Sequence, residues 1–271
     1  MKVFREPVLK RAVRGLALRA IAWVEETNNW NPRENGELLV LREALRYCRD
    51  LSAAGAVTVI DAGANRGDYV ELVCSEASAV GAPVSVHAFE PAASSHALLR
   101  ARHGGKPNVR INQVALSDRD GEGLIFSDTE GSSLASMFQR DLRAIDIELH
   151  RSERVRVARL DTYVRETALA HIHLLKVDVE GSEFGVLKGA GDFLNPGFID
   201  FIQFEYGGTN LDAGVPLKSF FSLLEPRGFM LGKLMSGGLR VANYGSWMDN
   251  YLYANYVAIS PKAFKRLAHR D

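Results

Sequence analysis

The 271-residue chain has the length of one large α/β domain with a short appendage, and two full domains would be cramped. Hydrophobic residues make up 46% of it and charged residues 24%, which is typical of a soluble globular protein and excludes a disordered or fibrous one. Lysine plus arginine and aspartate plus glutamate both number 33, so no overall positive charge attracts nucleic acid, and we predict no nucleic-acid partner.

Targeting signals and cysteine spacing indicate the cellular compartment and the state of the thiols. No segment reaches the roughly 20 apolar residues of a transmembrane helix, and the first residues lack the apolar stretch of a secretory signal, so we predict a cytoplasmic protein. Cys48 and Cys74 lie in segments with helical patterns and have no Cys or His nearby at zinc spacing. We predict that both are free thiols.

The first predicted element is a basic amphipathic helix within residues 1–27, part of an N-terminal extension over residues 1–34. Two interpretations stay open. The favoured one is a helix packed on the body of the protein or on a second copy in a homodimer, and the other is a helix lying on a membrane surface. The apolar positions at helical spacing are Leu9, Val13, Leu16, Ala20 and Val24, and the basic positions are Lys10, Arg11, Arg14 and Arg19.

Residues 35–271 are predicted to form one α/β domain, because apolar runs alternate with helical patterns from Val57 onward. The last two runs have no helix-length segment between them, so we expect them to pair as an antiparallel hairpin at one end of the sheet. The weakly periodic stretch at 121–157 is expected to lie over the binding pocket as an insertion. The seven predicted strands are Val57–Asp61, Val84–Phe89, Val109–Asn112, His173–Val177, Ile199–Glu205, Gly228–Leu234 and Tyr253–Ile259.

The strongest local motif is the turn after the first predicted strand, which contains Gly63, Asn65 and Gly67. Glycine lets the backbone pass close to a ligand, and such turns at the carboxyl edge of a parallel sheet bind nucleotides. The order Gly-x-Asn-x-Gly differs from the Gly-x-Gly-x-x-Gly of dinucleotide-binding proteins, and Asp61 ends the strand where it can meet a cationic ligand. The turn therefore favours a sulfonium with an amino-acid tail over a pyrophosphate.

The second predicted strand ends at Glu90, a little under thirty positions after Asp61. A carboxylate there can accept hydrogen bonds from both hydroxyls of an adenosine ribose. The alternative is a carboxylate that complements the N-terminus of the next helix. Small and apolar residues around Ala115 are expected to line the adenine.

Three carboxylates and one ammonium group are predicted to meet at the ends of the fourth and fifth strands. Such a set can orient an acceptor hydroxyl and remove its proton. Two other interpretations stay open: a structural ion pair between the lysine and an aspartate, and a Mg²⁺ site on the carboxylates. The residues are Lys176, Asp178, Glu180 and Glu205.

Three further residues outside this set are candidates for the acceptor pocket. His150, in the insertion, is a further candidate base. Tyr244 and Trp247 are expected to shape the pocket or simply to pack.

In this order along the chain, the motifs resemble the FkbM family of methyltransferases from about Asn35 to Ser260. The resemblance implies the Rossmann-like class I methyltransferase fold, with a seven-stranded, mostly parallel sheet and an antiparallel C-terminal strand. It also implies S-adenosylmethionine (SAM) as methyl donor, bound by Asp61, Gly63, Asn65 and Glu90, to which we add Glu37, Gly67 and Ala115. The matching segments are Asn35-Gly36-Glu37, Asp61-Ala62-Gly63-Ala64-Asn65, Phe89-Glu90-Pro91, Ala115-Leu116-Ser117, Leu160-Asp161-Thr162, Gln203-Phe204-Glu205-Tyr206 and, most specific, Leu175-Lys176-Val177-Asp178-Val179-Glu180-Gly181-Ser182-Glu183.

We therefore expect a SAM-dependent O-methyltransferase that acts on a hydroxyl of a sugar, a glycan or glycolipid, or a natural product. The alternatives are N- or carboxyl-methylation of a small molecule or protein, and a SAM-binding module without turnover. An NAD-dependent oxidoreductase is disfavoured, because the chain contains neither Gly-x-Gly-x-x-Gly nor Tyr-x-x-x-Lys.

Overall fold

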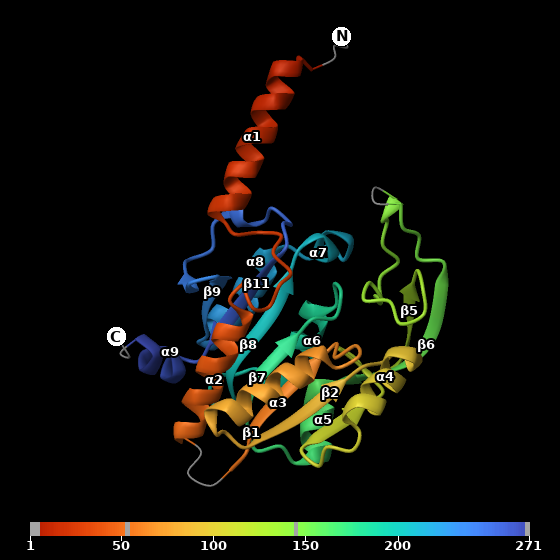
Figure 1. Ribbon diagram of the computed structural model, residues 1–271, viewed down its shortest axis with the longest axis vertical. Coiled ribbons are helices and arrows are strands. Elements are labelled where there is room, and N and C mark those ends of the chain that lie inside the picture. Colours follow the sequence, from red (N-terminus) through yellow and green to blue (C-terminus); the bar gives the residue numbers. More distant parts are fainter. Residues whose placement is uncertain (1–5, 52–54, 144–145, 269–271) are drawn as a thin grey trace.

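An eight-stranded sheet forms the centre of the protein, in a computed structural model that describes residues 6–51, 55–143 and 146–268 (Figure 1). Its strand order is β10-β9-β11-β8-β7-β1-β2-β3. The five neighbouring strands β8, β7, β1, β2 and β3 are parallel, and β11 runs antiparallel to both of its neighbours. The bounds are β1 Val57–Ala62, β2 Val84–Phe89, β3 Val109–Asn112, β7 Ile172–Val177, β8 Ile199–Tyr206, β9 Met230–Met235, β10 Gly238–Val241 and β11 Ala254–Ile259.

The mostly parallel α/β sheet confirms the predicted fold class, with two differences at its antiparallel end. The predicted pairing of the last two apolar runs is present, because β9 pairs with β11. However, β11 lies between β8 and β9, and the hairpin partner of β9 is an eighth strand, β10. β10 has only four residues and lies at the sheet edge, so it carries too short a pattern to be recognised in the sequence.

Helices cover both faces of the sheet and bury two hydrophobic clusters against it. One cluster takes side chains from α2, α3 and α9, and the other from α5, α6 and α8. Phe204 of β8 stacks on Phe220 of α8 with ring centroids 4.5 Å apart. The helix bounds are α2 Glu37–Leu51, α3 Asp68–Val80, α4 Ala93–His103, α5 Leu160–Thr167, α6 Glu183–Gly189, α7 Gly208–Asp212, α8 Leu217–Leu224 and α9 Pro261–Ala268.

The stretch expected as an irregular insertion contains regular strands. β5 (Gly121–Ser127) and β6 (Arg151–Arg159) pair antiparallel, and β4 (Ala115–Ser117) adds to β6 in parallel. In β6, buried Val155 and Val157 alternate with exposed arginines, so only one face of the strand packs. The many charges on the other face hid this period of two in the sequence.

The N-terminal helix α1 (Val8–Val24) projects away from the body of the protein (Figure 1). None of its residues is buried. The expectation that it packs on the body is therefore wrong, because the turn at 25–28 directs the helix outward. In the part of the chain that the structure describes, no helix combines the length and apolar character needed to cross a membrane.

Candidate active site

The sheet changes its direction of growth between β1 and β7. The chain proceeds from β1 outward to β2 and β3, and returns to β7 on the opposite side of β1. Ligands of open α/β sheets bind beyond the carboxyl ends of the strands at such a switch point. A cavity of about 900 Å³ lies there, bounded by the β1–α3 turn, the ends of β2, β7 and β8, and part of the insertion. This volume suits a small-molecule site.

The β1–α3 turn brings the ends of three strands together. The N–H groups of Gly63 and Ala64 donate to the carbonyl oxygen of Phe89 at 3.0 and 2.9 Å. Gly63 has a φ of +87°, and a Cβ there would lie 1.8 Å from the carbonyl oxygen of Asp178. Only glycine therefore allows this approach of β1 to the end of β7. The other glycine, Gly67, also has a positive φ, but it faces His103 of α4 and does not line the cavity.

Glu90 lies at the cavity wall and is joined to the turn. Its Oε2 accepts a hydrogen bond from the N–H of Asn65 at 2.9 Å, and its Oε1 accepts one from the N–H of Ala92 at 2.9 Å. Because Ala92 caps α4, the carboxylate also complements the N-terminus of that helix, as the alternative interpretation expected. Burial raises the pKa of Glu90 to about 7, against the effect of the two backbone donors. The carboxylate keeps lone pairs free for further donors.

Three polar atoms around the cavity are buried and have no hydrogen-bond partner among the described residues. They are the Oδ1 of Asn65, the hydroxyl of Tyr69 and the Oγ1 of Thr209, all from residues that line the cavity. A buried polar group without a partner costs about 1–3 kcal/mol, so each is a place where a ligand restores a lost hydrogen bond.

Asp61 lies behind the cavity wall. It is fully buried, both carboxylate oxygens lack a hydrogen-bond partner among the described residues, and it is not a lining residue. It pairs in register with Lys176 across β1 and β7. Burial raises the pKa of Asp61 to about 6, although Lys176 opposes this shift. The structure thus places the carboxylate beneath the site instead of facing a ligand directly.

Lys176 and Asp178 form an ion pair at the cavity floor. The Nζ of Lys176 donates to the Oδ2 of Asp178 at 2.8 Å and lies 4.8 Å from the ring centroid of Tyr69. Burial opposes the charge on Lys176, but the carboxylates of Asp178, Asp61 and Glu37 hold its pKa well above the usual value. The ammonium group therefore stays charged and fixes the carboxylate at the end of β7.

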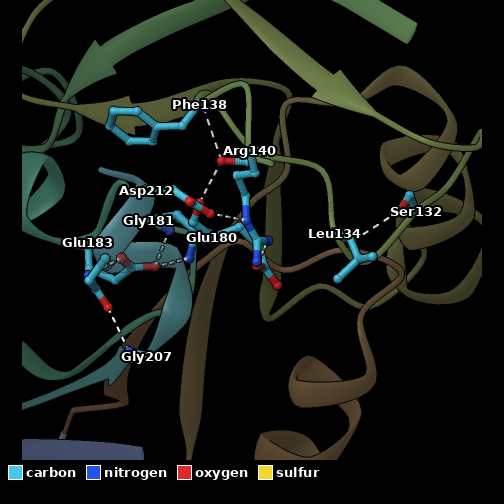
Figure 2. A network of polar contacts seen from close by, with 12 residues as sticks. Ser132, Leu134, Phe138, Arg140, Glu180, Gly181, Glu183, Gly207 and Asp212 are labelled. Atoms are coloured by element: carbon cyan, nitrogen blue, oxygen red, sulfur yellow. Dashed lines mark hydrogen bonds and ion pairs between the residues drawn. The ribbon is translucent and has the colours of Figure 1, made fainter. Parts of the chain in front are cut away.

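Glu180 is held at the cavity from two sides by the insertion. Its φ of +53° is in the left-handed region, which is unusual for a residue other than glycine and recurs at functional sites. Its backbone oxygen accepts from the hydroxyl of Ser136 at 2.6 Å, and its carboxylate accepts from Arg140 at 2.9 Å. Arg140 also donates to Asp212 at 3.2 Å, and Figure 2 shows it extending between the two carboxylates. Burial, reinforced by Asp178, raises the pKa of Glu180 to about 8, while Arg140 opposes the shift.

Three other glutamates support or complete the wall. Glu183 is buried and accepts from the N–H groups of Val179 and Gly181 at 3.1 and 3.0 Å, so it fixes the turn that carries Glu180. Glu205 lines the cavity, and burial together with the nearby Asp178 raises its pKa well above the usual value. Glu37 lines it too, but its two oxygens already accept from side-chain amides of the neighbouring residues Asn35, Gln203 and Asn255.

All predicted site residues line this cavity except Asp61 and Gly67. His150 is exposed, and Tyr244 and Trp247 lie outside the lining. Four further residues line the cavity that the sequence did not point to as site residues: Tyr69, Arg140, Thr209 and Tyr253. Tyr69 follows the glycine turn directly, which was a usable signal. Arg140 had none, because the segment around it has no periodicity.

Among the described residues, the carboxylates of Asp178, Glu180 and Glu205 do not converge as a group of metal ligands would. Among the described residues, the only His, Cys, Asp and Glu side chains that converge closely enough are those of Cys48, His173 and Asp200. This cluster lies near the amino ends of β7 and β8, at the opposite edge of the sheet from the cavity. The Nδ1 of His173 already accepts from the N–H of Thr58 at 2.9 Å, and burial raises the pKa of the Cys48 thiol. We therefore assign these groups to packing, and both cysteines are free as predicted.

Comparison with known proteins gives a consistent match. Residues 61–231 match the model of the methyltransferase FkbM domain, which confirms the resemblance seen in the motifs. The chain is 30% identical over 147 residues to the 2-O-methyltransferase NoeI of Sinorhizobium fredii (strain NBRC 101917 / NGR234), covering 50% of this chain and 59% of that protein. It is 32% identical over 161 residues to the 31-O-demethyl-FK506 methyltransferase FkbM of Streptomyces tacrolimicus, covering 49% of this chain and 59% of that protein. The chain thus spans somewhat more than half the length of these relatives.

Solved structures with a similar arrangement are more distant in sequence. The fibrillarin pre-rRNA processing protein of Methanococcus jannaschii is 12% identical, with a TM-score of 0.43 over 85% of this chain and 76% of that one. Fibrillarin of Aeropyrum pernix, solved with bound SAM, is 14% identical, with a TM-score of 0.40 over 80% of this chain and 76% of that one.

Proposed function

Because the chain belongs to the methyltransferase FkbM domain family, we propose that it is a SAM-dependent O-methyltransferase acting on a hydroxyl of a sugar, a glycan or glycolipid, or a natural product. The observation that carries the proposal is that the residues around the glycine turn and the carboxylates at the ends of β7 and β8 line one cavity. One half of that cavity suits the methyl donor, and the other suits an acceptor. The names of the two relatives, both O-methyltransferases, support the choice of oxygen.

The polar groups around the turn fit SAM. Glu90 offers free lone pairs for the ribose hydroxyls, and Ala115 offers an apolar contact for the adenine. The unpaired atoms of Asn65 and Tyr69 suit the ammonium and carboxylate groups of the amino-acid tail. The missing Cβ of Gly63 lets the end of β7 approach the turn, so that Asp178 lies beside the donor half of the cavity. When bound, SAM supplies a methyl group on a positively charged sulfur, which is the electrophile in the reaction.

The remaining groups act on the acceptor hydroxyl. We propose Glu180 as the base that takes its proton, because a pKa of about 8 lies near working pH, where a general base is most effective. Arg140 fixes the Glu180 carboxylate at 2.9 Å, and the Lys176–Asp178 ion pair fixes the floor below. Glu205 lies in the same cavity wall, where burial and the nearby Asp178 raise its pKa well above the usual value, and its carboxyl group hydrogen-bonds the acceptor. Magnesium has no part in this proposal.

The proposal is tested by incubating the protein with SAM labelled in its methyl group and a panel of sugars, glycans and hydroxylated natural products. We expect labelled methyl ether products, and a loss of kcat of about 100-fold or more in Glu180→Gln with little change in SAM affinity. The matched control is Glu166→Gln, an exposed glutamate of α5, which should leave kcat unchanged. If methylated products formed only on amines or carboxylates, the proposed hydroxyl acceptor would be wrong. If SAM bound but no acceptor gave a product, the assignment as an enzyme would be overturned.

A further inference from the structure

The exposed helix α1 has a chemistry that the methyltransferase site does not use. Its apolar side chains face solvent, with exposures of 75% for Leu9, 65% for Leu16 and 82% for Trp23. A contiguous apolar surface of this kind marks an interaction site. Something outside the body of the protein therefore covers this helix.

One face of the helix carries apolar side chains and no cation. At about 100° per residue, Leu9, Val13, Leu16, Ala20 and Trp23 share one face. The four basic residues of the helix lie on the remaining surface, and residues 7–24 contain no acidic residue. The only ion pair recorded for these cations in the described part of the chain joins Arg14 to Glu6, and it is exposed. The four cations are Lys10, Arg11, Arg14 and Arg19.

The end of α1 is fixed to the body beside the active-site cavity. Buried Glu25 forms ion pairs with Lys233 of β9 and Arg240 of β10. The N–H of Asn28 donates to the carbonyl oxygen of Tyr253 at 3.0 Å, and Trp30 packs against the Tyr253 ring at 5.4 Å. Asn28 and Trp30 line the cavity, and Trp30 is 67% exposed. Whatever binds α1 therefore lies close to this wall of the cavity.

We propose that α1 is a membrane-surface helix that docks the protein on a bilayer containing anionic lipids. A helix with an apolar face, a basic polar face and an aromatic residue at its end lies in the interface, with its cations at the lipid phosphates. Trp23, near the end of the helix, and Trp30 suit the headgroup level. The docked helix holds the nearby cavity wall at the membrane.

A lipid surface explains this helix better than a second copy of the chain does. Two copies paired through Leu9, Leu16 and Trp23 would flank their seam with Lys10 and Arg19 from each chain. Without an acidic residue, neither a parallel nor an antiparallel pair can form interhelical ion pairs, and the flanking charges repel. Anionic headgroups under the apolar face neutralise Lys10 and Arg19, which flank it.

The test is co-sedimentation of the full chain with vesicles of phosphatidylcholine alone, or of phosphatidylcholine mixed with phosphatidylglycerol. We expect tight binding only to the mixed vesicles. Replacing Lys10 and Arg19, which flank the apolar face, by Gln should weaken that binding roughly 30-fold, at about 1 kcal/mol per cation. Leu16→Gln should weaken it about tenfold or more. The matched control is Leu18→Gln, an exposed leucine about 200° around the helix from Leu16, which should bind like the wild type.

Equal binding to both vesicle types, or equal losses in Leu16→Gln and Leu18→Gln, would overturn the proposal. A wild-type dimer that Leu16→Gln dissociates, without vesicle binding, would assign the helix to a second copy instead. SAM affinity, measured on every variant, should stay unchanged, because α1 makes no buried contact with the body. Failure of SAM binding would count against the proposed activity and leave the docking result intact.

Discussion

Gly63 is the residue on which the close approach of β1 and β7 depends. Alanine there combines an unfavourable φ of +87° with a Cβ 1.8 Å from the carbonyl oxygen of Asp178. We expect Gly63→Ala to lower the free energy of unfolding by more than about 3 kcal/mol and to weaken SAM binding. Gly81→Ala is the control, because its φ is +68° but nothing lies within 4 Å of the added Cβ. Chemical denaturation should give that control a loss of only about 1 kcal/mol, and equal losses would contradict the account.

Glu90 gives SAM binding a pH dependence of known sign. Burial raises its pKa to about 7, so it is mostly protonated at about pH 6 and mostly ionised at about pH 8. Donors on the ribose favour the ionised form, so binding releases a proton and the Kd for SAM should fall as pH rises through 7, and then level off. Calorimetry in buffers of different ionisation enthalpy measures that proton release. In Glu90→Gln the release and the slope should both disappear.

For single residues, the sequence predicted which side chains lie close together but not the contacts that each one makes. Most site residues could be predicted because each lies at or just after the end of a strand, at the same edge of the sheet. They are Gly63, Asn65, Glu90 and the charged residues at the ends of β7 and β8. The position of Asp61 behind the cavity lining was not predictable, because the last residues of a strand alternate between facing the site and facing the interior. The left-handed conformation of Glu180 depends on contacts from the distant Ser136 and Arg140.

The insertion with β5 and β6 is the element that closes the cavity over Glu180. Arg140 links it to the body by ion pairs with Glu180 at 2.9 Å and Asp212 at 3.2 Å, beside the hydrogen bond from Ser136. We expect Arg140→Met to raise the KM for the acceptor about tenfold and to speed hydrogen exchange over residues 131–140, with little change in SAM affinity. Arg143→Met is the control, because Arg143 pairs only with its exposed neighbour Asp141 among the described residues. If both variants behaved alike, Arg140 would have no specific role.

Sequence patterns predicted the central strands better than the elements around them. β1, β2, β7 and β8 have mostly apolar, buried runs because helices cover both of their faces. β6 and β10 have at most one packed face and are short or highly charged, so the same reasoning missed them. The separation of α1 from the body was not predictable either, because an apolar face does not say what covers it.

On the scale of the whole molecule, Glu25 connects the N-terminal extension to the antiparallel end of the sheet. Its partner Lys233 is buried, so removing the carboxylate leaves an unpaired charge in the interior. We expect Glu25→Ala to lower the free energy of unfolding by about 3 kcal/mol in thermal or urea denaturation. Glu6→Ala removes only the exposed pair with Arg14 and should cost less than about 1 kcal/mol. A similar small loss in both would mean that the extension is not anchored through Glu25.

The proposed function requires that the protein bind SAM. The cavity, its unpaired polar atoms and the family match all support this binding. Calorimetric titration with SAM, and separately with NAD, tests it most directly on the wild type and on Glu90→Ala. We expect saturable SAM binding, at least tenfold weaker in Glu90→Ala because two ribose hydrogen bonds are lost, and no binding of NAD. Absence of SAM binding, or a preference for NAD, would contradict it.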